Sequence, residues 1–392
     1  MYAPGRRWRP QEKPTNPSND HLTIKKEYFI MKKVISLVLS VMMMLTMFAG
    51  CRASGTAETA APTAAPTAAA TAETAADTTP AAQEFNVAIV QQLDHASLDE
   101  IRTAIVAQLQ AQAEEKGVKV NIQEFNGQND ATVLNQIGAQ VVGDGVDLII
   151  PIATLAAQCM VTAADGTDIP IVYAAISDPE AAGLTGLSNV TGTSDALNTA
   201  AIMNLILAAD PEIDTIGLLY DLSQDSSTQA IADAKAFCDE KGIQYIEKNG
   251  TTTAEVQMAA EALVAAGVKA VFTPTDNTIM TAELSIYETF TEAGVMHFTG
   301  ADSFALNGAF VGYGVDYVQL GEATADMVAE ILCDGKSATE MPYQTFDNGI
   351  VTINTETAAA LGFEGDKLGA LKESFKPYCT EIVEVTTEED FS

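Results

Sequence analysis

The chain has 392 residues, of which 47% are apolar, and it carries a formal net charge of -33 at pH 7. This length is enough for two domains of ordinary size, and the apolar fraction is enough to fill their cores. A surface this acidic repels polyanions, which argues against nucleic acid as a partner, and the acidity is otherwise explained by solubility.

The first 50 residues have the composition of leader sequence. Residues 1–30 are basic and Pro-rich, and we expect them to belong to an upstream start choice. From Met31, two lysines, an apolar run over 34–48 and the small residues before Cys51 form the layout of a signal peptide over 31–50. Small residues before a cysteine resemble the bacterial lipobox, which implies lipidation of Cys51. An uncleaved anchor is the alternative, although the apolar run is short for a membrane span.

The next stretch, 51–84, consists almost only of Ala, Thr, Pro, Glu and Asp. It contains no large apolar residue, so it cannot bury a core. We expect a disordered tether between the lipid and the folded part of the protein.

From residue 85 onward, strand-like and helix-like segments alternate. In the first half, strands are expected at 85–90, 118–125, 146–152 and 169–176, and helices at 98–116, 131–142 and after Thr154. In the second half, helices are expected at 196–209, 227–241, 254–266, 279–293 and 320–333, and strands at 214–220, 243–248, 268–272, 295–299, 310–315 and 350–353. This alternation predicts an α/β fold whose parallel sheets are doubly wound, with helices on both faces.

The two halves are alike, and no linker rich in Pro, Gly or Ser separates them. We therefore expect two lobes joined by several crossings of the chain, near 193–196, 301–303 and 313–317. The expected N-terminal lobe comprises 85–195 and 302–316, and the expected C-terminal lobe comprises 196–301 and 317–385. Several crossings make a stiff hinge, which suits closure of the lobes around a ligand.

Two strands end in the same way. GVDLIIPIAT at 145–154 runs from a turn glycine through an apolar strand to Thr154, and GVKAVFTPTD at 267–276 does the same with Asp276. Ligands of open α/β sheets bind at such carboxyl ends, so we expect both side chains to face one cleft. An ordinary helix cap is the alternative interpretation of each residue.

The sequence lacks the common catalytic motifs GxSxG, the P-loop, HExxH and a GxGxxG after the first strand. Asp94, His95 and Asp99 could form a cluster, but no activated nucleophile accompanies them. We therefore expect neither enzymatic activity nor a cofactor, and the absence of CxxC spacing argues against zinc. Four further cysteines would either pair or serve as small buried residues, which the sequence leaves open: Cys159, Cys238, Cys333 and Cys379.

Several stretches together resemble the substrate-binding lipoproteins of ABC transporters of the tryptophan/tyrosine-binding type, which have the periplasmic-binding-protein type I fold. The similarity covers about 85–363 and is carried by IVQQLDH (89–95), DLIIPIAT (147–154), IPIV (169–172), SDP (177–179), NVTG (189–192), IGLLY (216–220), PTDN (274–277) and GVDY (314–317). Two departures are Ser226-Ser227, where the family tends to have Asn-Ser, and Asp94-His95-Ala96, where it tends to have Glu-His-Pro.

The resemblance implies an amino acid ligand, whose two charges need complementary groups. N–H groups at Ala153 and Thr154, at a helix N-terminus, would bind its carboxylate, and Asp276 would bind its ammonium group. The other residues expected at the cleft are Gln91, Ser177, Tyr220, Ser226, Ser227, Thr275, Asn277 and Asp302. Aromatic walls could come from four residues, for which core packing is the alternative: Tyr173, Tyr220, Phe304 and Tyr313.

The resemblance therefore predicts an extracytoplasmic, lipid-anchored binding protein of an ABC importer. It would act as a monomer, bind an amino acid such as tryptophan or tyrosine, and deliver it to a permease and its ATPase. A sugar or nucleoside is the alternative ligand, although such sites usually stack rings on Trp and Trp8 precedes the signal. A surface adhesin or a sensor module is the alternative function.

Overall fold

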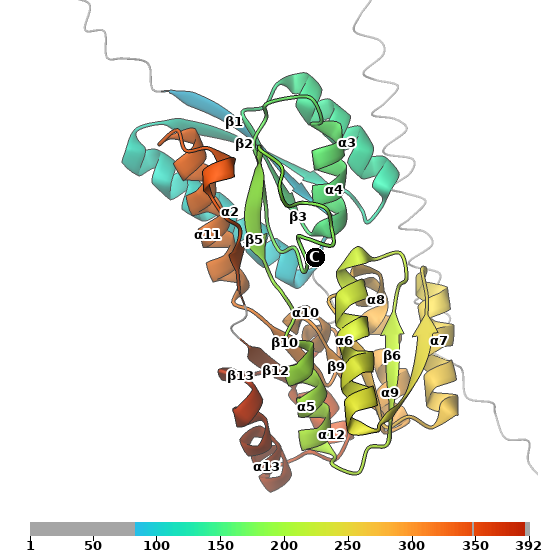
Figure 1. The fold of residues 1–392 in the computed structure, drawn as a ribbon. Helices are drawn as coiled ribbons and strands as arrows, with labels where there is room; N and C mark the ends of the chain where they lie inside the picture. The colour runs from blue at the N-terminus through green and yellow to red at the C-terminus, as the bar shows by residue number, and fades with distance from the viewer. Residues whose placement is uncertain (1–82, 347–348, 389–392) are drawn as a thin grey trace, which may run out of the picture. The chain divides into compact units, whose positions relative to one another are not determined.

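The computed structural model describes residues 83–346 and 349–388. The expectations for the upstream segment, the signal peptide, Cys51 and nearly all of the tether lie outside these residues. Within them, the chain forms two α/β lobes, each built around one sheet (Figure 1).

The first lobe contains a parallel sheet with the strand order β11-β5-β4-β3-β1-β2. Figure 1 shows α2 and α11 on one side of this sheet and α3 and α4 on the other. The strands are β1 (Glu84–Gln91), β2 (Lys119–Asn126), β3 (Leu148–Ile152), β4 (Ile171–Tyr173), β5 (Val190–Ser194) and β11 (Gln344–Thr345). The helices are α2 (Ala96–Lys116), α3 (Ala131–Asp144), α4 (Thr154–Ala163), α11 (Tyr317–Leu332) and the short η2 (Ala338–Glu340).

The second lobe contains a sheet with the order β13-β12-β10-β9-β8-β6-β7, which is parallel except where β10 meets β12. Its strands are β6 (Thr215–Tyr220), β7 (Gln244–Asn249), β8 (Ala270–Thr273), β9 (Met296–Thr299), β10 (Val311–Gly314), β12 (Ile350–Asn354) and β13 (Glu381–Val385). Its helices are α5 (Thr199–Ala209), α6 (Asp225–Lys241), α7 (Thr253–Ala266), α8 (Asn277–Ala282), η1 (Glu283–Ser285), α9 (Tyr287–Glu292), α10 (Asp302–Leu306), α12 (Thr355–Ala360), α13 (Asp366–Phe375) and η3 (Lys376–Tyr378). The doubly wound α/β fold expected from the sequence is confirmed.

The pattern of side chains explains why these elements form. All five residues of β3 are buried, as an apolar strand covered on both faces requires. Helices end where the sequence supplies glycine: Gly117 after α2 and Gly242 after α6 both adopt left-handed backbone.

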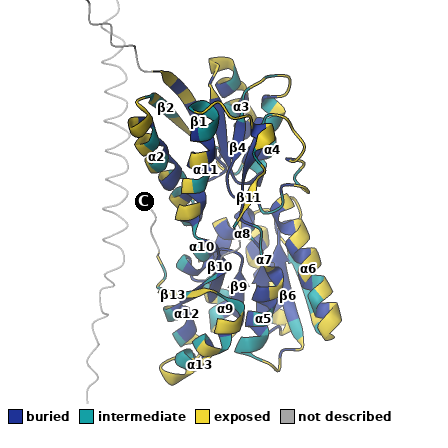
Figure 2. Cartoon of the chain, turned by 60° about the vertical axis from the view of Figure 1, so that its left-hand side comes forward, coloured by how far each residue is buried: buried dark blue, intermediate teal, exposed yellow. Residues whose placement is uncertain are grey.

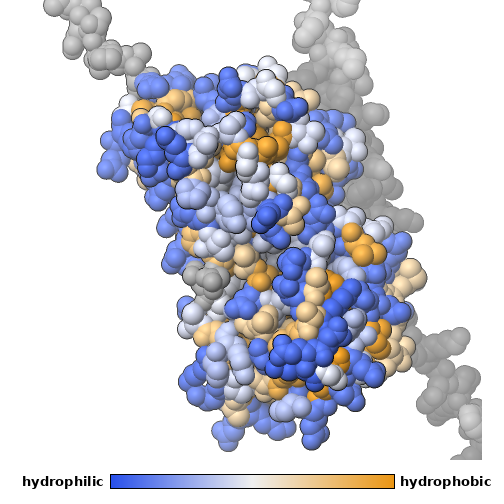
Figure 3. Space-filling view, in the orientation of Figure 1, coloured by the Kyte–Doolittle hydropathy of each residue, from blue (hydrophilic) through white to orange (hydrophobic). Residues whose placement is uncertain are grey.

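Figure 2 shows buried strands at the centre of each lobe and exposed residues on the outer faces of the helices. Hydrophilic side chains cover most of the face drawn in Figure 3, with apolar patches only scattered among them.

The expected lobe assignment is wrong for two segments, residues 302–316 and helix α11. Residues 302–316 belong to the second lobe, because β10 pairs with β9 and β12. Helix α11 belongs to the first lobe, where it packs against α2. The two helices approach closely at Gly321, where a Cβ atom would lie 2.7 Å from the carbonyl oxygen of Ile101.

The chain crosses between the lobes in three places within the described ranges: between β5 and α5, between β10 and α11, and between β11 and β12. The first two agree with the crossings expected near 193–196 and 313–317. The crossing expected near 301–303 is wrong, because β9, α10 and β10 all belong to the second lobe, and the return after β11 was missed.

Two further elements differ from expectation. The helix expected over 279–293 is broken into α8, η1 and α9, and the break brings Glu283 into the core, where Oε1 lies 2.9 Å from Nδ1 of His297. Strand β5 was missed, because its sequence VTGTS is small and polar. Glycine is required in it, since a Cβ atom at Gly192 would lie 2.1 Å from the carbonyl oxygen of Tyr173.

Candidate functional site

A small cavity, here called the central cavity, lies between the lobes at the carboxyl ends of both sets of strands. Its volume is about 20 Å³, which is enough for about one water molecule. An organic ligand can therefore occupy it only after the lobes move apart. The lining residues are His95, Ser97, Leu98, Thr154, Ala175, Ser177, Asp195, Ser226, Thr275, Asn277, Ala301 and Tyr317.

The backbone is strained on the first-lobe side of this cavity. Ala153, after β3, has a φ of 74°, and Ala175, after β4, has a φ of 56°. Left-handed backbone costs a non-glycine residue on the order of 1–3 kcal/mol, and such strain clusters at ligand sites. The N–H group of Ala153 donates to the carbonyl oxygen of Ala174 at 3.0 Å, which ties the two strand ends together.

Helix α4 begins at this edge of the cavity. The first N–H groups of a helix have no partner within the helix. Gln92 Oε1 accepts from the N–H group of Leu155 at 3.0 Å. The buried side chain of Thr154, at the first position of α4, lines the cavity. With the hydroxyl of Ser177 nearby in the lining, this edge is suited to an anionic group such as a carboxylate.

A buried carboxylate, that of Asp195, lies in the same cavity. Asp195 follows β5 and is 5% exposed. Its Oδ1 accepts a hydrogen bond from Ser177 Oγ at 3.2 Å. Burial raises the pKa of Asp195 to about 6, because desolvation outweighs these hydrogen bonds. A cation in the cavity would stabilise the ionised form of this group.

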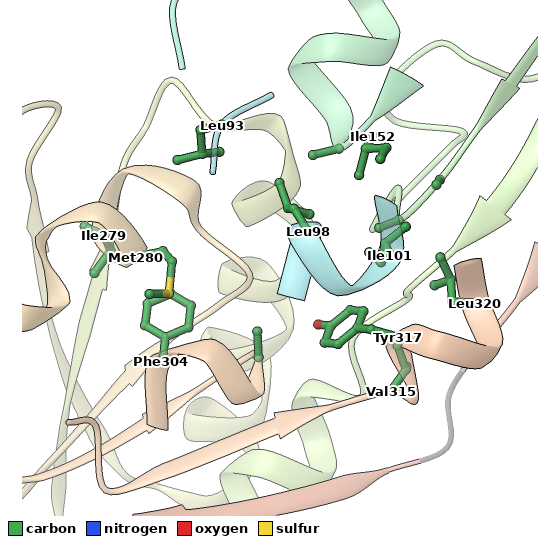
Figure 4. Close-up of a cluster of buried hydrophobic side chains, with 14 of the residues drawn as sticks. Leu93, Leu98, Ile101, Ile152, Ile279, Met280, Phe304, Val315, Tyr317 and Leu320 are labelled. Atoms are coloured by element: carbon green, nitrogen blue, oxygen red, sulfur yellow. The ribbon is translucent and has the colours of Figure 1, made fainter. Parts of the chain in front are cut away.

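The aromatic wall of the cavity is Tyr317, at the start of α11. Figure 4 shows its ring near Leu98, at the start of α2. Burial, and then the charges of Asp195, Asp302 and Glu100, raise the pKa of Tyr317 well above its ordinary value. Tyr317 is therefore a neutral phenol that closes the cavity on the side of the hinge.

Polar contacts join the lobes around the cavity. His95 Nε2 lies 3.2 Å from Asn277 Oδ1, and Ser97 Oγ donates to Asp302 Oδ1 at 2.8 Å. At the rim, Gln158 Nε2 donates to Asp225 Oδ2 at 2.8 Å. Burial lowers the pKa of His95 to about 4, so its ring is neutral at physiological pH.

The structure brings about half of the predicted residues to the central cavity. These are Thr154, Ser177, Ser226, Thr275 and Asn277. Asp302 contacts this lining through Ser97. Ala153 lies outside the lining, and its N–H group, expected to bind the ligand carboxylate, donates instead to the carbonyl oxygen of Ala174. Ser226 is notable because its Oγ is buried without a hydrogen-bond partner in the described part of the chain.

The structure does not support Asp276 as the ammonium partner. The residue is 1% exposed and lies outside the cavity lining. Its Oδ1 accepts from the N–H groups of Thr278 and Ile279, and its Oδ2 accepts from the N–H group of Asp221 and from Ser227 Oγ. Both oxygens are thus occupied, and the alternative interpretation, a helix cap, is the one that the geometry supports.

Three other predicted residues also have structural roles. Ser227 binds Asp276, as above. Gln91 donates to the carbonyl oxygen of Leu93 at 2.6 Å and accepts from Arg102 Nε at 3.0 Å. The hydroxyl of Tyr220 donates to Glu247 Oε2 at 2.6 Å. The proposed aromatic walls Tyr173, Tyr220, Phe304 and Tyr313 are all core residues that lie outside the lining.

Asp195, Ser97 and Tyr317 were missed by the sequence interpretation as site residues. Asp195 directly follows a strand, which is the position that was examined for Thr154 and Asp276. The signal was lost because β5 was not recognised as a strand. Asp94, His95 and Asp99 line one cavity together, with His95 in contact with Asn277 and Asp99 in contact with Gln91 and Arg102.

No group of His, Cys, Asp and Glu within the described ranges is arranged to hold a metal ion. None of the helices in this part of the chain is long and apolar enough to span a membrane. The four cysteines that the structure describes are free, with Cys159 and Cys238 buried, and burial raises the pKa of the Cys238 thiol to about 11.

Comparison with known proteins agrees with this arrangement. Residues 86–367 match the family model described as ABC transporter substrate binding protein. A tyrosine-binding protein of Clostridioides difficile (strain R20291) is 29% identical over 291 residues, which cover 73% of this chain and 83% of the relative.

Solved structures are similar over the same region. A conserved domain protein from Vibrio cholerae is 29% identical, with 76% of this chain and 99% of that chain covered and a TM-score of 0.69. An ABC domain in complex with L-Trp from Streptococcus pneumonia is 27% identical, with 77% and 100% covered and a TM-score of 0.68. The family match spans most of the chain, and it is a match to binding proteins, not to enzymes. This protein therefore belongs to the ABC transporter substrate-binding protein family, with the type I periplasmic-binding-protein fold.

Proposed function

We propose that the protein binds an aromatic α-amino acid, with the zwitterionic head of the ligand in the central cavity. The carboxylate would accept hydrogen bonds from Thr154 at the start of α4, whereas the hydroxyl of Ser177 stays with Asp195. The ammonium group would bind Asp195. The observation that carries this proposal is the presence, in one cavity, of a helix N-terminus and a buried, weakly hydrogen-bonded carboxylate.

The spacing of these groups along the fold supports a single ligand that carries both charges. Thr154 follows β3, Ser177 follows β4 and Asp195 follows β5, and these strands are neighbours in the sheet. Their carboxyl ends therefore meet at one edge. Ser226, from the second lobe, adds a buried hydroxyl that has no partner among the described residues, and it would bind the same head group after closure.

The similar proteins favour an aromatic side chain. One is named a tyrosine-binding protein, and the structure of another contains L-Trp. Tyr317 offers a ring to such a ligand. A sugar is less favoured, because Trp8 is the single tryptophan of the sequence and precedes the folded lobes.

The lipid anchor and the transport partners belong to the same proposal. The lipobox-like sequence before Cys51 supports anchoring of the protein outside the cytoplasm, and the family supports delivery of the ligand to a permease and its ATPase. A similar substrate-binding protein of Clostridium difficile is described as having adhesive properties, which keeps a surface adhesin as the second candidate.

A thermal-shift screen tests the ligand. A form beginning at Arg52 is screened against the twenty amino acids, a set of sugars and a set of nucleosides. An aromatic amino acid at one hundred times its Kd should stabilise the protein by about 2.7 kcal/mol. Stabilisation by a sugar or nucleoside alone would reject the proposal.

A further inference from the structure

Gln92, the first residue after β1, is buried and joins two other segments of the first lobe. Its backbone N–H group donates to the carbonyl oxygen of Ile152, at the end of β3, at 3.1 Å. Its backbone carbonyl oxygen accepts from the N–H group of Asn129, in the loop between β2 and α3, at 2.9 Å. The main chain of Gln92 is therefore fixed from both sides, and its side chain extends from a rigid position.

The side-chain amide of Gln92 connects the same loop to the start of α4. Its Nε2 donates to Oδ1 of Asn129 at 2.8 Å, and its Oε1 accepts from the N–H group of Leu155 at 3.0 Å. An amide has donors on one side and an acceptor on the other. If the amide turned over, its NH2 group would face the N–H group of Leu155 and its oxygen would face Oδ1 of Asn129. Both contacts would be unfavourable, so the acceptor on Asn129 sets the orientation of the amide.

The loop holds Asn129 through an uncommon backbone conformation. Gln128 and Asn129 both have a φ of 54°, in the left-handed region. Asn adopts this conformation more readily than most other residues with a side chain. The side chain of Gln128 is exposed, and no hydrogen bond joins it to Gln92 in the described part of the chain. The two residues therefore share a backbone conformation but differ in their contact with Gln92.

The hydrogen bond between Gln92 and Leu155 has a consequence for the central cavity. Leu155 directly follows Thr154, whose buried side chain lines that cavity. Fixing the N–H group of Leu155 fixes the first turn of α4, and with it the position of Thr154. Gln92 itself lies outside the lining, so it can act on a ligand only through α4. All of these segments belong to the first lobe, so the arrangement does not depend on closure.

We propose that Gln92 is a positioning residue for the carboxylate of the ligand, with Asn129 setting the orientation of its amide. This inference rests on the proposed binding of an aromatic amino acid through Thr154. A group that is held in place before the ligand arrives loses less conformational freedom on binding, so a looser start of α4 should weaken binding. One neutral hydrogen bond changes an equilibrium by about 2- to 10-fold.

Two substitutions of Asn129 separate its acceptor from the rest of the loop. Asn129→Gly keeps the left-handed backbone and removes the acceptor, so it should weaken binding of L-tyrosine by about 2- to 10-fold. Asn129→Asp keeps an oxygen that accepts from Nε2 of Gln92, so affinity should stay within about twofold of wild type. The matched control is Gln128→Gly, which makes the same kind of change at the neighbouring left-handed position and should not alter affinity.

Titration calorimetry of the form beginning at Arg52 with L-tyrosine and L-tryptophan measures these affinities, and circular dichroism confirms folding. Gln92→Met keeps the length of the side chain, removes both of its hydrogen bonds and completes a double-mutant cycle with Asn129→Gly. Once Gln92 is replaced, Asn129→Gly should cost no further affinity, because the hydrogen bond between the two residues is already absent. If Gln92→Met does not fold, the three loop variants decide the test.

The outcomes separate this inference from the proposed function. A loss in Asn129→Gly that is absent from both Asn129→Asp and Gln128→Gly supports the inference. Wild-type affinity in Asn129→Gly, an equal loss in Asn129→Asp or in Gln128→Gly, or an additive double-mutant cycle would overturn it, although the proposed function would stand. If the wild type binds neither amino acid, the proposed function fails and the inference fails with it.

Discussion

Replacement of Asp195 by Asn should strongly weaken ligand binding and at the same time stabilise the free protein. Asn keeps the size of the side chain and removes its charge. Loss of one partner of a buried, hydrogen-bonded charge pair costs about 2–5 kcal/mol. The affinity for an aromatic amino acid should therefore fall about thirtyfold to several-thousandfold.

The gain in stability follows from the pKa of the same group. Burial raises the pKa of Asp195 to about 6 from an ordinary value of 3.8, which corresponds to a cost of about 3 kcal/mol for the ionised form in the folded state. Because the folded-state pKa lies above the unfolded value, this cost is absent below about pH 4, grows between about pH 4 and 6, and is fully present above that range. Asp195→Asn removes it, so the free energy of unfolding at pH 7 should rise by up to about 3 kcal/mol.

Calorimetry at several pH values completes the test. A ligand ammonium group binds the ionised carboxylate, and a group with a pKa of about 6 is ionised about tenfold less at pH 5 than at pH 7. Wild-type affinity should fall by about that factor between these values, and affinity of the Asn variant should not change. If Asp195→Asn keeps its affinity within about threefold and circular dichroism shows a folded protein, the ammonium group binds elsewhere and the proposed orientation is wrong.

Four further predictions concern the fold, the motion of the lobes, the contact between Gln158 and Asp225, and the anchor. Asp276→Ala removes a helix cap and the acceptor of Ser227 Oγ, so chemical unfolding should show a loss of about 2–4 kcal/mol, whereas calorimetry on the folded variant should give an affinity within about threefold of wild type. Because the central cavity of this closed form holds only about one water molecule, the free protein should be more open in solution. Binding of L-tyrosine should then reduce the radius of gyration in small-angle scattering, and an unchanged radius at saturation would contradict closure. Gln158→Ala, which breaks the rim contact with Asp225, should weaken all aromatic ligands equally by a few fold, and a change in their ranking would assign Gln158 to the site. Cys51→Ala should release the protein from membranes in cell fractionation, and a variant that still sediments with them would exclude the lipid anchor.

Much of the fold could be predicted because its determinants are local. The run at 148–152 is apolar and buried throughout, and glycines such as Gly117 and Gly242 end helices through their own backbone conformation. The assignment of segments to lobes could not be predicted in this way. Helix α11 packs on α2 across more than 200 residues of sequence, and no pattern within α11 specifies which sheet it covers.

The candidate site was predictable only in part, for a related reason. Thr154 and Asp276 have the same local pattern, a strand end followed by a helix start. What distinguishes them is the segment 221–227, which is distant in sequence and supplies the N–H group of Asp221 and the hydroxyl of Ser227 to Asp276. Asp195 could not be predicted as a site residue, because the strand before it consists mostly of small polar residues and lacks the apolar run that indicates a buried strand. Its strand forms because β4 and β11 pair with it on either side.

Asp195 and Asp276 show how a structural acid differs from an acid that is available to a ligand. Burial raises the pKa of each to about 6, so the pKa alone does not separate them. Their hydrogen bonds distinguish them. Asp276 accepts from four donors, two on each oxygen, whereas Asp195 accepts from one side-chain donor, Ser177. A carboxylate with little hydrogen bonding keeps a cost in the free protein that a bound ammonium group would remove. The cost of the buried, ionised Asp195 would therefore disfavour the closed state without ligand. The closed state with ligand would be favoured, since the ammonium group of the ligand pairs with this carboxylate.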